Sequence, residues 1–236
     1  MAGRTPQQQR GVERRLALLE AAGRAFDRTG YASAALADIV KDAGSTLGGL
    51  GFYFPHKEDL ARAVIDEQNA RTFASLAAAG GSFAPMEAMI HSSKIIADQL
   101  ITDPLVRGGI RLSMELGVLS EPTHGFYDEW LSQVGVLFTM AQEAGELVEG
   151  AASPAELAAT SVSYFTGVHI VAGVLTGRAD LYRRLHVMWQ MLVPGMARED
   201  LRPGLLALAA ELFTGPQPTP TPTSPEPGAH TAPASS

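Results

Sequence analysis

The sequence predicts an all-α protein with a small N-terminal head and a larger helical body, about nine to ten helices in all. Three observations support this fold class. Apolar residues recur at spacings of three and four along almost every periodic stretch, which is typical of amphipathic helices. Helix start and stop signals separate these stretches. No segment shows a convincing alternation of apolar and polar residues, so no strand is expected.

Three helices are expected in the head. The first is predicted to stop at Gly30, after an apolar face formed by Leu16, Leu19, Gly23 and Phe26. The second is short, can be capped by Ser33 and closes at Gly44. Its inward face is expected to consist of Leu36, Ile39 and Val40. Together with the next helix, this segment has the layout of a helix-turn-helix.

The second half of that helix-turn-helix reads GSTLGGLGFYFPH, residues 44–56. Ser45 or Thr46 can cap a third helix that runs through Tyr53, and Pro55 ends it. The segment contains four glycines and neither lysine nor arginine. A glycine inside a helix costs about 1 kcal/mol relative to alanine. We therefore expect a reading helix with little charge and weak intrinsic helicity.

The body is expected to contain the remaining helices. They are predicted at 57–76, 86–100, 104–116, 126–147, 154–176, 180–196 and 201–213. The sharpest start signal is Ser153-Pro154-Ala155-Glu156, which combines a capping serine, a proline at the first position and a glutamate at the third. Pro194 is expected to bend or end the helix that contains it.

Charge and proline content suggest the domain limits. Residues 1–30 carry a net charge of +3 and residues 61–236 a net charge of −8, which suits contact with a polyanion at one end. Chance variation over thirty residues is the alternative. Seven of the fifteen prolines fall after residue 215. We predict a flexible basic arm (1–9), a helix-turn-helix domain (10–56), a ligand-binding and dimerisation domain (57–214) and a disordered tail (215–236).

Cysteine is absent, which excludes disulfides and thiolate metal sites and is compatible with a reducing cytoplasm. Residues 157–177 contain no Asp, Glu, Lys or Arg and have about the length of a membrane span. The same run contains threonine, serine, tyrosine and histidine, so a helix buried in a core or a subunit interface is favoured. We expect a cytoplasmic protein without membrane contact.

Residues 18–65 resemble the N-terminal signature of the TetR family of bacterial repressors. The stretches VRGGIRLSMELG (106–117), FYDEWLSQV (126–134) and MWQMLVPGM (188–196) resemble the γ-butyrolactone receptor subgroup of actinobacteria. This resemblance implies a homodimer that binds double-stranded operator DNA and is released by a small autoregulator of the γ-butyrolactone or butenolide type. It also implies a role in quorum sensing and in the regulation of antibiotic biosynthesis.

The departures from the family pattern fall in the reading helix. The family usually reads Thr-Lys-Gly-Ala-Leu-Tyr-x-His-Phe, whereas residues 46–54 read TLGGLGFYF. Leu47 and Gly51 occupy the places of a lysine and a tyrosine that commonly contact phosphates. Losing the cation lowers affinity and salt dependence. The candidate DNA-contacting residues are Arg14, Arg15, Ser45, Thr46, Leu47, Gly48, Gly51, Tyr53 and Lys57.

Two hypotheses about DNA binding remain open. In the first, the chain is a repressor with reduced or altered operator affinity. In the second, it is a sensor or pseudo-receptor on the same scaffold, with weak or lost DNA binding, that acts through its ligand or a protein partner. The basic arm and Lys57 favour the first hypothesis, and Leu47 and Gly51 favour the second.

The resemblance places a ligand chamber in the body. Trp130 aligns with the tryptophan that stacks on the ligand in the subgroup; the alternative is a core aromatic. Gln68 or Thr166 can hydrogen-bond a lactone or butenolide carbonyl, and His169 is expected to be a hydrogen-bonded buried histidine. The candidate ligand-binding residues are Gln68, Met89, Leu112, Met114, Trp130, Val134, Phe138, Phe165 and Thr166. The last two long helices are the expected dimer pair.

Enzyme motifs are missing from the sequence. There is no G-x-S-x-G nucleophile motif, no histidine pair with metal-ligand spacing, and no glycine-rich phosphate loop after a strand. We therefore predict a protein that is not an enzyme and that uses no metal or cofactor.

Overall fold

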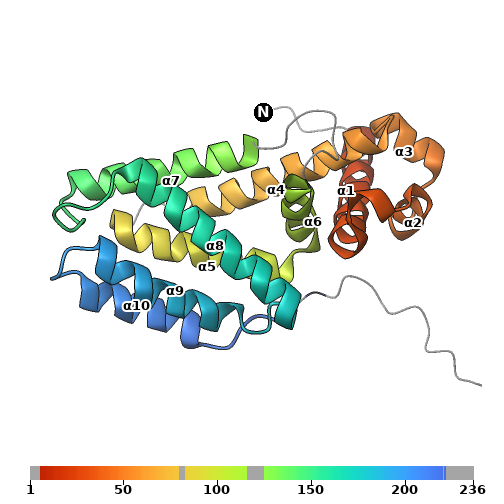
Figure 1. Ribbon diagram of the computed structural model, residues 1–236. Helices are drawn as coiled ribbons and strands as arrows, with labels where there is room; N and C mark the ends of the chain where they lie inside the picture. The colour runs from red at the N-terminus through yellow and green to blue at the C-terminus, as the bar shows by residue number, and fades with distance from the viewer. Residues whose placement is uncertain (1–5, 80–82, 116–124, 220, 222–236) are drawn as a thin grey trace, which may run out of the picture.

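The computed structural model describes residues 6–79, 83–115, 125–219 and 221. Across these ranges the chain forms ten helices: α1 (Pro6–Ser33), α2 (Leu36–Asp42), α3 (Leu47–Tyr53), α4 (Lys57–Ala79), α5 (Pro85–Thr102), α6 (Pro104–Met114), α7 (Gly125–Glu143), α8 (Pro154–Thr176), α9 (Leu181–Met196) and α10 (Arg202–Thr214). The all-α prediction is confirmed. Figure 1 shows α1–α3 gathered as a head at one end, with α4 running from it into the body.

Several local signals act as the sequence predicts. The chain kinks at Gly30, which has a φ of 76°. Thr46, rather than Ser45, caps α3 by accepting a hydrogen bond from the Gly49 amide at 3.1 Å. The capping box at Ser153 and Glu156 is present in full. The Ser33 cap, in contrast, is wrong: α1 continues through Ser33, and α2 follows Ala35 without a side-chain cap.

Two segment boundaries differ from expectation. Residues 6–9 of the predicted flexible arm are part of α1. The seventh helix ends at Glu143 instead of residue 147, because Gly145 turns the chain with a φ of 67°. The Val148 amide then donates to the Met196 carbonyl at 2.8 Å. Residues 144–148 are thus held by the end of α9.

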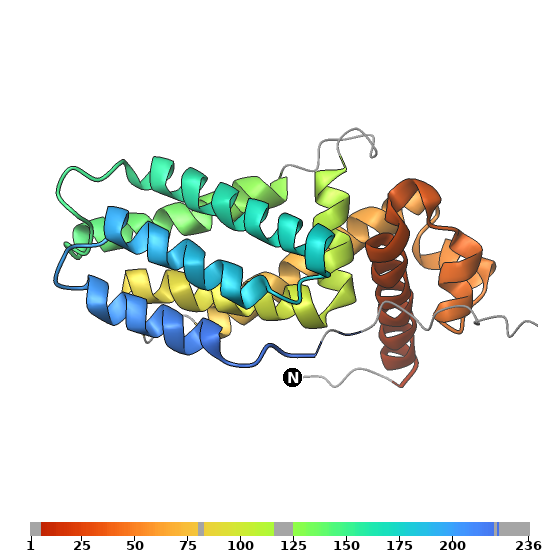
Figure 2. The ribbon, with the colours of Figure 1, turned by 60° about the horizontal axis from the view of Figure 1, so that its bottom comes forward.

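The beginning of the predicted disordered tail packs against the body. The Gln217 side chain accepts a hydrogen bond from the Tyr182 amide and donates to the Ala179 carbonyl, each at 2.7 Å. The Thr221 carbonyl accepts from Arg107 of α6 at 3.2 Å. In Figure 2 this segment runs from α10 toward the head end of the molecule. The rest of the predicted tail (222–236) and residues 1–5 of the arm lie outside the described residues.

The hydrophobic interior consists of two clusters. The body cluster draws on α5 to α10. The head cluster draws on α1–α3 and is completed by the first half of α4 and by Leu105 and Leu112 of α6. Packing therefore crosses the predicted boundary at residue 57, and α6 is the element that contributes to both clusters.

The joint between head and body is a close contact of α1 with α6. A Cβ placed on Gly108 would lie 2.3 Å from the Gly23 carbonyl oxygen, so this approach requires glycine. Beside it, the buried Arg107 guanidinium donates to the Asp27 carboxylate at 2.8 Å. Arg111 donates to the Asp27 carbonyl at 2.7 Å. Buried charges are stable only when they are paired in this way.

A second set of ion pairs connects α4 to both neighbours. Arg71 pairs with Glu20 of α1 at 2.5 Å, with Glu67 of α4 at 3.0 Å and with Asp103, the N-cap of α6, at 3.0 Å. Hydrogen bonds to these carboxylates raise the pKa of Arg71 despite its partial burial. The joint is thus held by side chains from α1, α4 and α6.

Candidate functional site

The exposed face of α3 is apolar and uncharged. Leu50 packs inward, whereas Leu47 is 57% exposed and Phe52 is 81% exposed. Gly48 and Gly51 are also exposed, and no heavy atom lies within 4 Å of a Cβ built on either. The helix therefore presents two apolar side chains and open backbone where a reading helix would meet bases and phosphates.

Cations near this face come from α1. Arg10, Glu13 and Arg14 line a surface hollow whose other side is formed by Ser45 and Thr46, at the start of α3, and by Tyr53 at its end. Arg15 is exposed and lies 5.5 Å from the centre of the Phe54 ring. Backbone amides at a helix start attract anions. The predicted residues Arg14, Ser45 and Thr46 thus share one hollow suited to a phosphate.

Two of the side chains that were predicted to contact phosphate form contacts within the chain instead. The Tyr53 hydroxyl donates to the Gly11 carbonyl at 3.2 Å. The Lys57 ammonium donates to the Ala32 carbonyl at 3.3 Å and lies 4.8 Å from the centre of the Tyr31 ring. Burial lowers the pKa of Lys57. Both side chains hold α3 and α4 against α1, and their contact with DNA stays a prediction.

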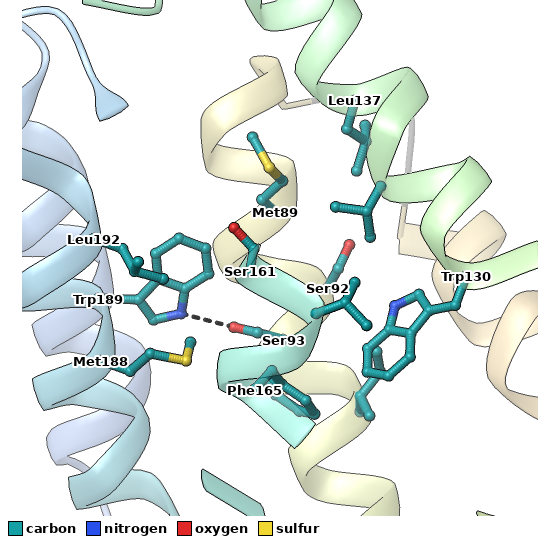
Figure 3. A pocket seen from close by; sticks show the side chains of 13 residues that line it. Met89, Ser92, Ser93, Trp130, Leu137, Ser161, Phe165, Met188, Trp189 and Leu192 are labelled. Atoms are coloured by element: carbon teal, nitrogen blue, oxygen red, sulfur yellow. Dashed lines mark hydrogen bonds between the residues drawn. The ribbon is translucent and has the colours of Figure 1, made fainter. Parts of the chain in front are cut away.

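The body contains an outer cavity between α5, α7, α8 and α9, with a volume of about 60 Å³. Its walls are Met89, Ser92, Ser93, Ile96, Trp130, Val134, Leu137, Ser161, Val162, Phe165, Met188, Trp189 and Leu192. Figure 3 shows the Trp130 ring from α7 on one side and the Trp189 ring from α9 on the other. The Trp189 indole N–H donates to the Ser93 hydroxyl at 2.9 Å, which fixes that wall.

A smaller inner cavity, with a volume of about 10 Å³, lies deeper, against α4 and α6. Its lining consists of Gln68, Thr72, Phe73, Ile96, Ile110, Trp130, Phe165 and His169. Ile96, Trp130 and Phe165 line both cavities and therefore separate them. The Trp130 and Phe165 rings meet edge to face, with centres 5.7 Å apart.

Two buried polar atoms belong to residues of the inner cavity. Gln68 has no exposed surface, and its Oε1 has no hydrogen-bond partner. His169 is 2% exposed, and its Nδ1 also has no partner. Burial, together with the positive charge of Arg178, lowers the pKa of His169 to about 4. The imidazole is therefore neutral at pH 7, and the expectation of a hydrogen-bonded histidine does not hold for its Nδ1.

The structure brings together five of the nine predicted ligand-binding residues. Met89, Val134, Trp130 and Phe165 line the outer cavity, and Gln68 lines the inner one with Trp130 and Phe165. The prediction for Leu112 is wrong, because this side chain lines neither cavity and is buried in the head cluster. Phe138, Met114 and Thr166 line neither cavity; Phe138 is completely buried and Met114 packs against the body cluster.

Residues that were not selected from the sequence also line the cavities: Thr72 lines the inner one and Trp189 the outer one. Thr72 lies one turn after Gln68 on α4, a spacing of four that places both on one helix face. Trp189 lies in a segment that was assigned to the dimer pair. The helical spacing was the available signal for Thr72; no local signal marks Trp189 as a cavity wall.

The outer surface of α8 and α9 is apolar. Val174 is 79% exposed, Leu175 is 67% exposed and Met191 is 63% exposed. A groove between the two helices is lined by Tyr164, Val168 and Val171 of α8 and by Val187, Arg183 and Arg184 of α9, so two arginines border the apolar side chains. In the described part of the chain, α8 is the helix whose length and composition would allow it to cross a membrane, and about a third of its apolar window is buried. An apolar face of this extent indicates an interaction surface.

Comparison with known proteins agrees with this architecture. Residues 18–64 match the family described as bacterial regulatory proteins, tetR family, and residues 83–198 match the tetracyclin repressor-like C-terminal domain. The chain is 32% identical over 200 residues to the A-factor receptor protein of Streptomyces griseus, covering 85% of this chain and 68% of that protein.

Solved structures show the same relationship. A gamma-butyrolactone receptor described as ArpA-like matches with a TM-score of 0.74 and 28% identity, over 87% of this chain and 98% of that one. CprB from Streptomyces coelicolor, in complex with its biological operator sequence, matches with a TM-score of 0.72 and 28% identity, over 84% and 97%. The chain therefore belongs to the TetR family of bacterial regulatory proteins.

Proposed function

We propose that this chain is a homodimeric transcriptional repressor that leaves its operator when a small γ-butyrolactone- or butenolide-type molecule enters the body. The observation that carries the proposal is the pair of cavities that meet at Trp130 and Phe165. Their apolar walls and few polar groups suit a small, largely apolar ligand. The similarity to the A-factor receptor and to operator-bound CprB supports both halves of the proposal.

Helix α6 offers a direct route from the cavities to the head. A Cβ on Gly109 would lie 2.6 Å from the Gln68 Cβ, so α6 packs directly on the stem of a residue that lines the inner cavity. The adjacent Gly108 packs on Gly23 of α1. A ligand that displaces α4 at Gln68 therefore displaces α6 and, through it, α1. The ligand needs only to favour the displaced state by a few kcal/mol.

The apolar face of α8 and α9 is the proposed dimer surface. Pairing two copies there covers Val174, Leu175 and Met191 and sets the distance between the two heads. Two helix-turn-helix units read half-sites about one turn of DNA apart, so a change in their spacing weakens binding. Light scattering at micromolar concentration should give twice the chain mass; a monomer would contradict this arrangement.

A gel-shift experiment tests the repressor function. The full chain is incubated with DNA from upstream of its own gene, and a γ-butyrolactone is then added. We expect a shifted band that the lactone abolishes. Trp130→Ala should retain the shift and lose the response to lactone, because it removes the wall shared by both cavities. A band that no lactone or butenolide alters would refute the proposed release.

The neutral face of α3 is the observation that favours the sensor or pseudo-receptor alternative. Leu47→Lys and Gly51→Tyr, introduced together, place a cation and a hydroxyl on that face. If the native chain gives no shift and the double variant does, the sensor function is the better description. A salt-dependent shift by the native chain supports the repressor and assigns phosphate binding to the arginines of α1.

A further inference from the structure

The outward face of α3 carries no side-chain group that can donate or accept a hydrogen bond. At about 100° per residue, this face covers an arc of about 140° and consists, in order around the helix, of Leu47, Gly51, Gly48 and Phe52. All four residues are exposed, whereas Leu50, on the other side of the helix, is buried. Two apolar side chains therefore border a strip that is made of two glycines.

The glycine strip allows the helix backbone itself to approach a partner closely. No heavy atom lies within 4 Å of a Cβ built on Gly48 or on Gly51, so the strip is open in the described part of the chain. Glycine is the residue that lets backbone come near a ligand. A partner that binds here meets bare backbone in the middle and the side chains of Leu47 and Phe52 at the two edges.

The Phe52 ring is held in place although it is exposed. The Tyr53 ring meets it edge to face, with ring centres 5.0 Å apart. Tyr53 is itself fixed, because its hydroxyl donates to the Gly11 carbonyl of α1 at 3.2 Å. An aromatic ring supplies a large contact area and loses little conformational entropy on binding. Phe52 is thus prepared for a contact outside the chain.

The surroundings of this face favour a polyanion as the partner. Phe52 lines the same hollow as Arg10 and Arg14, whose charges Glu13 offsets only in part. Two apolar side chains are also too few for a stable protein interface, which takes roughly 20–30 residues a side. Duplex DNA fits both the charge and the small size of the apolar face.

One feature of the major groove suits an apolar side chain. The base edges present hydrogen-bond donors and acceptors there, and thymine adds its C5 methyl group. Leu47 and Phe52 cannot bond the donors and acceptors, and covering them would remove their water at a cost. Contact with a methyl group, in contrast, removes apolar surface from water on both sides and is favourable. The outward face of α3 is thus matched to thymine.

We propose that Leu47 and Phe52 determine the base specificity of this protein by contacting thymine methyl groups, one on each side of the strip formed by Gly48 and Gly51. This inference rests on the proposed function. It gives Leu47 a base contact in place of the phosphate contact of the family's lysine, and it leaves the phosphates to the arginines of α1. Each half-site then has a thymine at two positions, and affinity depends on the methyl groups of both.

The test compares two DNA probes that differ only in methyl groups. One is the fragment that the native chain shifts in the gel; the other has the same sequence with every thymine replaced by uracil, which pairs identically and lacks the methyl group. Binding of the full chain is measured by the fluorescence anisotropy of an end-labelled duplex. A buried methyl group is worth about a four-fold change in affinity, and a dimer contacts four, so the uracil probe should bind at least about ten-fold more weakly.

Salt separates an apolar contact from a charged one. Both probes carry the same phosphates, so the logarithm of the affinity should fall with the logarithm of the salt concentration at the same slope for both. The ratio of the two affinities should therefore stay constant between about 50 and 200 mM salt. A ratio that disappears at the higher concentration would overturn the apolar contact.

Leu47→Ala combined with Phe52→Ala supplies the matched variant, because it removes both apolar side chains and leaves the charges of the head unchanged. We expect it to bind the two probes about equally, mainly through weaker binding of the thymine probe. Val136→Ala is the control, since Val136 is 53% exposed on α7 in the body, and it should keep the preference for thymine. Circular dichroism melts establish that each variant is folded.

The outcomes separate this inference from the proposed function. Equal affinities of the native chain for the two probes would overturn methyl recognition, and so would a preference for thymine that the double variant retains, because the DNA itself would then be its source. In either case, a shifted band that a lactone abolishes would leave the repressor function in place. A native chain that shifts no DNA would overturn both. The comparison of the two probes on the native chain remains decisive even if the double variant does not fold.

Discussion

The joint, where α1 contacts α6, and the chamber, which consists of the outer and inner cavities of the body, lie on opposite sides of α6. They are packed in opposite ways. At the joint, Gly108 touches the backbone of α1, and Arg107 uses its buried charge on Asp27 and on the carbonyls of Leu100 and Ile101. In the chamber, empty space remains and the polar atoms of Gln68 and His169 lack partners. The charges of Arg107 and Asp27 at the joint are thus paired, whereas Gln68 Oε1 and His169 Nδ1 in the chamber have no partner.

This difference indicates how a signal crosses the molecule. A region held by close packing and several hydrogen bonds moves as a unit, because deforming it breaks several interactions together. A region with space and unpaired groups gains contacts when a ligand enters. We infer that a ligand forms its contacts in the chamber. Helices α6 and α1 then move together, and the head moves with them.

The largest expected effect is at the buried ion pair of the joint. Arg107→Met leaves the Asp27 carboxylate buried without its partner, so the free energy of unfolding should fall by about 3–5 kcal/mol. The side chains of Arg107 and Asp27 are only 7% and 13% exposed. Chemical denaturation measures the change.

Arg24→Met is the matched control, since Arg24 pairs with Asp42 at 2.9 Å but the two side chains are 28% and 42% exposed. Its cost should be at most about 1 kcal/mol. Equal losses in the two variants would mean that the joint is no more tightly held than the surface.

The second prediction concerns the chamber and its response to pH. The pKa of His169 is lowered from 6.5 to about 4, so the unfolded chain binds a proton first as the pH falls. The free energy of unfolding should therefore decrease from about pH 6.5 down to about pH 4, by roughly 3 kcal/mol in total.

His169→Phe removes this titration. Denaturant melts between pH 7 and pH 4 should show a shallower slope for the variant than for the native chain. His186→Phe, on the partly exposed surface of α9, is the control and should leave the slope unchanged. Identical slopes for the native chain and His169→Phe would contradict a buried neutral imidazole.

A smaller effect is expected from the glycine at the centre of the joint. Gly108→Ala directs a Cβ to within 2.3 Å of the Gly23 carbonyl oxygen, and backbone cannot move aside cheaply. We expect a loss of about 1–3 kcal/mol in the free energy of unfolding. In contrast, Gly135→Ala on α7 has no heavy atom within 4 Å and should gain about 0.5–1 kcal/mol. If both substitutions stabilise the chain, the joint is not tightly packed.

The smallest effect lies outside both regions, on α3. Gly51→Ala meets open space and removes a flexible residue from a seven-residue helix. The free energy of unfolding should rise by about 1 kcal/mol, and the affinity for lactone should not change. A changed lactone affinity would show that the reading helix and the chamber are coupled even without DNA.

Local patterns accounted for most of the helices. The Thr46 cap, the Gly30 kink and the capping box at Ser153 each depend on residues within four positions of one another, and such short-range geometry can be inferred from sequence. The Ser33 cap was wrong because Ser33 is the last residue of α1 and Ala35 takes the N-cap position of α2. A periodic apolar pattern predicts that a residue is buried, but it does not predict which helix that residue packs against.

The candidate site shows the same division. The sequence by itself determined the helical class and the neutral reading helix, and the family resemblance pointed to Trp130, which the structure places beside both cavities. Tertiary structure alone decided that Leu112 packs in the head, that Gly108 and Gly109 face two different helices, and that Thr72 bonds both Gln68 and Gln99. The physical reason is that these contacts join residues far apart in the chain. Hydrogen-bond direction, in particular, is set by whichever group lies opposite, and only the folded chain brings that group into place.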